Sequence, residues 1–178
     1  TRKESSAASD VYKRQVIVSA AGEVAGVGAT QPVGGAHAEV MALRAAGEKA
    51  RGGTAVVTLE PCAHTGRTGP CTQALIDAGV ACVYYLHPDP TSQAAGGARA
   101  LAEAGVDVIK LEKPPQVEDA LMPWLWAMRT RRPHITLKFA QSLDGFTAAA
   151  DGTSQWITGE SARDWVPVSY THLTLPTT

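Results

Sequence analysis

Short apolar stretches rich in β-branched residues alternate with helical stretches along the middle of the chain, and this alternation constrains the fold most. Residues 54–59 (TAVVTL), 81–86 (ACVYYL) and 106–110 (VDVIK) have the composition of buried strands. Helical stretches at 73–78 and 93–104 separate them. Because each helix must bury one side against a sheet, the pattern predicts a layered α/β fold.

The residues before this segment extend the same domain. Residues 16–18 and 24–29 are short apolar stretches around Gly22, which predicts a hairpin. Residues 38–50 carry alanine, leucine, methionine and glutamate at helical density, and the glycines at 52–53 end that helix. We therefore expect one domain from residue 16 to about residue 112.

A second domain is predicted to begin after a linker. The sequence Lys-Pro-Pro at 113–115 interrupts the pattern, and an amphipathic helix is expected at 117–129. The stretch 134–139 (HITLKF) predicts the first strand of another α/β unit. Residues 113–132 are thus interpreted as a linker helix and residues 133–167 as the start of the second domain.

The two ends of the chain look foreign to the rest. Residues 5–15 (SSAASDVYKRQ) and 168–178 (VSYTHLTLPTT) resemble translations of one sequencing-library adapter read on opposite strands. We therefore expect 1–15 and 168–178 to be foreign tails, and the domain at 16–112 to be clipped at its N-terminal side. A pair of disordered natural tails is the alternative.

Composition excludes some function classes without selecting one. The formal net charge is −1, with 44% hydrophobic and 19% charged residues, so no nucleic-acid partner is expected. The sequence has neither a membrane-spanning apolar run nor a signal peptide, and no membrane partner is expected. The odd number of cysteines, three, argues against a disulfide framework and favours the cytoplasm. The oligomeric state, including a homo-oligomer, stays open.

Four residues carry the chemistry. His37 and Glu39 stand at a predicted helix start, Cys62 follows a strand, and Cys71 precedes a second helix. A catalytic zinc takes three protein ligands and keeps one position for water, and His37, Cys62 and Cys71 supply that set. Each feature alone has a simpler explanation, a solvated helix start or two buried cysteines. Together and in this order they predict a Zn²⁺ site.

The same pattern predicts a reaction. A histidine and a glutamate two residues apart, followed by a Pro-Cys sequence and a second cysteine, form the signature of zinc deaminases. Zinc lowers the pKa of water to about 7. Glu39 would accept a proton from this water and deliver protons to a ring nitrogen and the departing amine. Ammonia leaves, and the carbon that carried the amine becomes a carbonyl.

The motifs resemble one deaminase family closely. The segment 58–71 (TLEPCAHTGRTGPC) has more residues between its cysteines than cytidine or tRNA deaminases have. Together with HAE at 37–39 and the stretch 79–90, it resembles the bifunctional deaminase/reductase of riboflavin biosynthesis. Residues 136–145 (TLKFAQSLDG) and 151–157 (DGTSQWI) resemble the opening of the family's reductase half.

This resemblance implies a fold and a substrate. It implies a cytidine-deaminase-like, three-layer α/β/α domain followed by the start of a dihydrofolate-reductase-like α/β domain. The implied substrate is a small pyrimidine ribotide, 2,5-diamino-6-ribosylamino-4(3H)-pyrimidinone 5′-phosphate. His64, Arg67, Thr68 and Ser154 are its candidate contacts, although a loop arginine such as Arg67 is often simply solvated.

The resemblance also implies NADPH for the full-length reductase. Ala140 and Trp156 are the candidate contacts, with a core anchor as the alternative for Trp156. The reductase stretch covers little of the family's dinucleotide-binding sheet, so no hydride transfer is expected from this chain. The family's first helix and Pro-Asn-Pro loop are not found before Val16, and Gly69, Thr91 and Phe146 depart from the usual residues.

Two other functions remain open at this point. One is a different nucleobase deaminase on the same zinc fold, acting on tRNA adenosine or guanine, against which the long spacing between Cys62 and Cys71 argues. The other is a structural zinc module without catalysis. A structural site normally has four protein ligands, and His64 is the residue that could be the fourth.

Overall fold

The computed structural model describes two compact units, one ending at His134 and the other beginning at Ile135. The described residues are 14–32, 34–66, 68–91, 95–112, 115–135, 137, 139–153 and 157–163.

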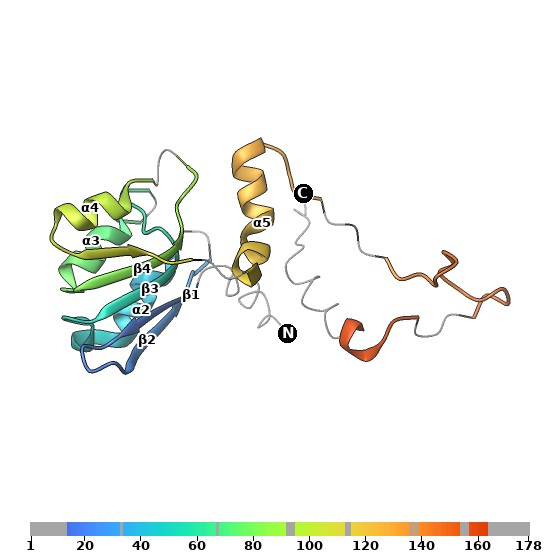
Figure 1. Cartoon of the computed structure of the whole chain (residues 1–178), viewed down its shortest axis with the longest axis horizontal. Helices are drawn as coiled ribbons and strands as arrows, with labels where there is room; N and C mark the ends of the chain where they lie inside the picture. Colours follow the sequence, from blue (N-terminus) through green and yellow to red (C-terminus); the bar gives the residue numbers. More distant parts are fainter. Residues whose placement is uncertain are drawn as a thin grey trace. The chain divides into compact units, whose positions relative to one another are not determined.

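The first unit is built on a five-stranded sheet in the order β2-β1-β3-β4-β5 (Figure 1). Strands β1 (Arg14–Val18) and β2 (Val24–Ala29) form an antiparallel hairpin, and β1 also pairs antiparallel with β3 (Thr54–Leu59). Strands β4 (Cys82–His87) and β5 (Asp107–Lys110) continue the sheet parallel to β3. The predicted hairpin and the predicted alternation of strands and helices are confirmed.

Three helices lie on one face of this sheet. Helix α2 (Ala38–Ala46) packs on β2 and β1 and continues into a 3-10 turn, η1 (Gly47–Ala50). Helix α3 (Cys71–Asp77) contacts α2, and α4 (Gly97–Glu103) contacts α3. The core between helices and sheet is made of small and medium apolar side chains, among them Ile17, Ala42, Ala55, Val57, Leu75, Val83 and Leu101.

The opposite face of the sheet is also apolar but less covered. The alternate residues Val16, Val56 and Tyr84 are half-buried there, whereas Val27 and Ile109 are exposed. The first unit also contains helix α5 (Pro115–Thr130), in which Leu121 and Leu125 are buried. No helix in the described part of the chain is long and apolar enough to cross a membrane.

Some element boundaries differ from the sequence-based expectation. Strand β1 begins at Arg14, so Arg14 and the buried Gln15 belong to the sheet although they fall within the predicted tail. Pairing in a sheet uses only backbone N–H and C=O groups, which any sequence can supply. Helix α4 begins at Gly97, later than predicted, because Gly96 adopts a left-handed conformation at its N-cap. The remaining residues of both predicted tails, 1–13 and 168–178, lie outside the described residues.

A strand was predicted at 134–139, of which the structure describes residues 134, 135, 137 and 139. These residues form no strand, and Ile135 and Leu137 are 84% and 79% exposed. A strand exists only by pairing with a neighbour, and the described residues from 135 to 163 include none. Two tight turns instead organise this stretch, one closed by Ser142 and Phe146 around Gly145, the other by Asp151 and Thr153.

Candidate metal centre

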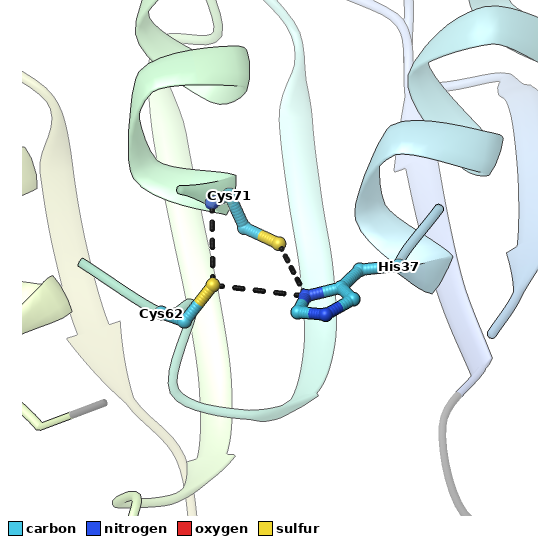
Figure 2. A group of neighbouring side chains, drawn as sticks. All are labelled: His37, Cys62 and Cys71. Carbon is cyan, nitrogen blue, oxygen red and sulfur yellow. Dashed lines mark hydrogen bonds between the residues drawn. The ribbon is translucent and has the colours of Figure 1, made fainter. Parts of the chain in front are cut away.

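Three of the predicted ligands meet at one point in the first unit (Figure 2). His37 is the N-cap of α2, Cys62 lies on the loop after β3, and Cys71 is the first residue of α3. Their ligand atoms all lie within 4.8 Å of one another. The described residues contain no other such group of potential metal ligands.

The distances suit a tetrahedral metal ion. His37 Nδ1 lies 3.2 Å from Cys71 Sγ and 3.6 Å from Cys62 Sγ. With Zn–N near ~2.0 Å and Zn–S near ~2.3 Å, ligand atoms around tetrahedral zinc are about 3.5–3.8 Å apart. The His37 ring therefore turns Nδ1 toward both sulfur atoms at nearly the separation that zinc requires, and the cluster fits this ion.

Two glycines bring the helix that carries His37 close to the sheet. A Cβ atom on Gly28 would lie 2.1 Å from the backbone oxygen of Ala38, and one on Gly26 would lie 2.3 Å from that of Ala42. No side chain fits between β2 and α2 at these points. This close approach sets the position of the first turn of α2, and with it the position of His37.

The two thiols form a coupled, buried pair. A hydrogen bond from Cys71, and to a lesser degree the His37 ring, lowers the pKa of Cys62 to about 4 against the opposing effect of burial. The hydrogen bond with Cys62, burial and the nearby Glu39 raise the pKa of Cys71. The backbone N–H of Cys71 also donates to Cys62 Sγ over 3.4 Å. A metal ion would replace the proton that this pair retains.

Glu39 lies beside the cluster. It is the second residue of α2 and is only 7% exposed. The charge of its carboxylate contributes to raising the pKa of the nearby Cys71 thiol. The predicted acid–base residue therefore lies beside the predicted metal ligands, in a site where only His37 is half-buried and the other three residues are buried.

The described residues between Cys62 and Cys71 add no further ligand to this cluster. His64 is half-buried and is not part of the ligand group, and its Nδ1 has no hydrogen-bond partner among the described residues. Thr68 is half-buried, and Arg67 lies outside the described residues. With His64 apart from the other ligands, the described cluster has three protein ligands and does not support a four-ligand structural site.

Of the candidate residues of the second unit, the structure describes only Ala140. Ala140 is exposed, and Ser154 and Trp156 lie outside the described residues. A cavity of about 700 Å³ adjoins the turn at Ser142 and Asp144, but Ala140 is not among its lining residues. Within the described part of the chain, only the first unit brings predicted site residues together.

One residue near the centre was not predicted to have a role. Glu60 lies in the segment 58–71, and its side chain is buried and accepts two backbone hydrogen bonds. The available signal was a carboxylate placed directly between a buried strand and a metal ligand, where a charged residue needs partners.

Comparison with family models divides the chain in two. Residues 4–87 match the cytidine and deoxycytidylate deaminase zinc-binding region, which includes all three clustered ligands and Glu39. Residues 133–169 match the RibD C-terminal domain. The first match agrees with the predicted deaminase fold, and the second agrees with a reductase domain starting after the linker helix.

Individual proteins match over both parts. The riboflavin biosynthesis protein RibD of Corynebacterium ammoniagenes is 64% identical over 157 residues, which are 88% of this chain and 47% of that protein. The structure of Acinetobacter baumannii RibD is 45% identical, with a TM-score of 0.75 over 90% of this chain and 45% of that chain.

A third similar protein is the Thermotoga maritima diaminohydroxyphosphoribosylaminopyrimidine deaminase/5-amino-6-(5-phosphoribosylamino)uracil reductase. Its structure is 31% identical, with a TM-score of 0.77 over 90% of this chain and 48% of that chain. This chain thus spans about half the length of the relatives that it matches. Sequence identity, fold and the conjunction of both family models show that the chain belongs to the family of the riboflavin biosynthesis protein RibD.

Proposed function

We propose that this chain is a zinc-dependent hydrolytic deaminase acting in riboflavin biosynthesis. The observation that carries the proposal is the cluster of the half-buried His37 and the buried Cys62 and Cys71, with the Glu39 carboxylate beside it. Three protein ligands next to a potential proton carrier are the arrangement of a catalytic zinc site. Membership of the RibD family supports the same conclusion.

The ligands and their surroundings define what the zinc site contributes. His37 Nδ1 and the two thiolates would hold the ion. When bound, zinc acts as a Lewis acid and lowers the pKa of water to about 7. The two thiolates balance the charge of the ion, and their burial keeps bulk water away from them. The three side chains come from different elements, which fixes their mutual geometry.

Glu39 moves protons in the proposed reaction. Its carboxylate accepts a proton from the attacking water and passes it to the ring nitrogen. It then takes the second proton from the hydroxyl now bonded to the ring carbon and delivers it to the departing amine, so that ammonia is released and the carbonyl forms. Burial keeps this carboxylate oriented toward the cluster. The net change replaces a C–NH₂ group of the substrate by a carbonyl, with one water consumed for each ammonia released.

The proposed substrate is 2,5-diamino-6-ribosylamino-4(3H)-pyrimidinone 5′-phosphate. The family membership supports this choice over tRNA adenosine or guanine, as does the long Cys62–Cys71 loop. In this proposal His64, Arg67 and Thr68 of that loop contact the substrate, because they stand between two metal ligands and thus border the site. Ser154 is retained as a further candidate contact.

The second unit is proposed to belong to the reductase part of the family. NADPH, with Ala140 and Trp156 as candidate contacts, is the cofactor proposed for the full-length reductase. For this chain we propose the deaminase reaction alone, since Ala140 is exposed and does not line the cavity at Ser142 and Asp144. A cytoplasmic location is proposed because the thiolate ligands must stay reduced. A homo-oligomer stays open, and neither nucleic acid nor membrane is proposed as a partner.

The test is ammonia release from the pyrimidine ribotide by the zinc-loaded chain, with the Glu39→Gln variant beside it. Glutamine keeps the size of the side chain but cannot accept a proton, so we expect zinc content to be unchanged and release to fall by at least ~100-fold. Equal release by both proteins would remove Glu39 from the reaction. A wild-type chain that binds one zinc and releases no ammonia would instead indicate a non-catalytic zinc module.

A further inference from the structure

The carboxylate of Glu60 is buried and fully engaged with backbone donors. The residue is 8% exposed, and it lies directly between strand β3 and the Pro61-Cys62 sequence. Its Oε1 accepts a hydrogen bond from the N–H of Ala98 over 2.9 Å. Its Oε2 accepts one from the N–H of Asp89 over 3.2 Å. A buried carboxylate without such donors would be strongly unfavourable, so these bonds fix where the side chain lies.

The two donors belong to a different part of the chain from Glu60. Asp89 lies on the segment after β4, and Ala98 is the second residue of α4, where backbone N–H groups have no partner within the helix. The backbone N–H of Glu60 also donates to the backbone oxygen of His87 over 2.8 Å. One residue thus joins the end of β3 to the end of β4 and to the start of α4.

The next two residues are held against the same elements. A Cβ atom on Gly97 would lie 1.7 Å from the backbone oxygen of Pro61, so α4 contacts this segment directly. On the other side, the N–H of Thr72 in α3 donates to the backbone oxygen of Cys62 over 3.2 Å. The backbone from Glu60 to Cys62 is therefore fixed between α4 and α3, and Cys62 is the residue that carries a metal-binding sulfur.

We propose that Glu60 is a positioning residue for the metal centre, acting through the backbone of Pro61 and Cys62. Its two hydrogen bonds set the place of the Cys62 sulfur relative to His37 and Cys71. Loss of a group that orients a metal ligand costs about 10–100-fold in metal affinity. The inference rests on the metal site of the proposed function, but not on the deaminase reaction.

The test compares Co²⁺ binding by the full chain with binding by Glu60→Gln and Glu60→Ala. Cobalt reports both affinity and geometry, through its thiolate charge-transfer and ligand-field absorption. Glutamine keeps one acceptor oxygen but turns an NH₂ group toward the second backbone N–H, whereas alanine removes both acceptors. We expect Co²⁺ affinity to fall about 10-fold for Gln and up to about 100-fold for Ala, with altered absorption bands.

A control separates this role from plain loss of stability. Val83 is fully buried in the sheet core and lies outside the metal cluster, so Val83→Ala destabilises the fold by creating a cavity. Measured at a temperature where all proteins remain folded, Val83→Ala should keep the wild-type Co²⁺ affinity and absorption bands. The Glu60 variants should have lower Co²⁺ affinity and altered absorption bands even where their thermal stability equals that of Val83→Ala.

The possible results distinguish the two proposals. Glu60 variants with wild-type affinity and bands would overturn the positioning role and leave the proposed deaminase intact. Bands that change equally in the Val83→Ala variant would overturn it as well, because any destabilisation would then have the same effect. A wild-type chain that binds no Co²⁺ at the cysteine pair would overturn the metal site itself, and with it both proposals.

Discussion

The two units of this chain both carry motifs of one family, but among the described residues only those of the first unit gather into a candidate site. In the first unit, residues far apart in sequence, such as the half-buried His37 and the buried Cys71, meet in one cluster. In the second, the apolar side chains of Ile135 and Leu137 are exposed, and order among the described residues comes from local turns. The difference is not one of motif quality, since both segments match their family models.

The two units differ in how the residues of their motifs are held in place. The predicted metal ligands lie on elements that contact one another, through the close approach of α2 to β2 and the hydrogen bonds of Glu60. The turn at Asp151 needs only residues two positions apart. A sequence signature therefore indicates chemistry only where a sheet and its helices hold the signature in place.

The largest expected effect is loss of zinc from the Cys62→Ala variant. Removing one of three ligands leaves two, which cannot hold a catalytic zinc against competing chelators. We expect bound zinc to fall from one ion per chain to none, as measured by metal analysis after dialysis. The Cys82→Ala variant is the matched control, because Cys82 is a free thiol outside the cluster. Zinc retained by Cys62→Ala would show that the cluster is not the metal site.

The next effect should come from Gly28→Ala, which tests whether packing in the first unit sets the site. The added Cβ would collide with backbone atoms of Ala38 and Ala42 in α2. We expect a stability loss of about 1–3 kcal/mol by denaturant unfolding, and weaker zinc binding because His37 moves with α2. Gly69→Ala is the control, since nothing lies near its Cβ position. Equal stability of the two variants would contradict the tight approach.

The smallest effect concerns the second unit. The side-chain and backbone donors of Thr153 hold the pKa of Asp151 below its usual value of 3.8. The folded-state pKa is lowered, so the turn's contribution is present above the ordinary pKa and is lost as pH falls through the lowered value. An NMR titration should give a midpoint below 3.8 for Asp151. In the Thr153→Val variant the midpoint should rise, and an unchanged midpoint would show that the hydroxyl bond is absent.

Most elements of the first unit could be predicted because each one has a residue composition typical of its own secondary structure. The runs at 54–59 and 81–86 contain the residues that a buried strand needs, and both are strands in the structure. The cluster of His37, Cys62 and Cys71 could be predicted because one histidine and two cysteines in this order form a known set of zinc ligands. Their roles at the metal remain a prediction until they are tested.

What the sequence did not predict depends on contacts between distant residues. The backbone N–H of Ala98 reaches the Glu60 carboxylate only in the folded chain, and the residues near Glu60 in the sequence do not indicate this hydrogen bond. The same holds for Gly28 and Ala38. At 134–139, where a strand was expected, none of the described residues is in a strand. The segment has alternating apolar side chains, but a strand also needs a pairing partner, which the segment's own sequence does not encode.

The origin of the three ligands in separate elements makes the metal a cross-link. An ion held by His37, Cys62 and Cys71 would cross-link the start of α2, the loop after β3 and the start of α3. A ligand that binds only the folded state adds stability by mass action, about 2.7 kcal/mol at a free concentration one hundred times its dissociation constant. The amount of folded protein in a cell would therefore follow the supply of zinc, before any substrate is bound.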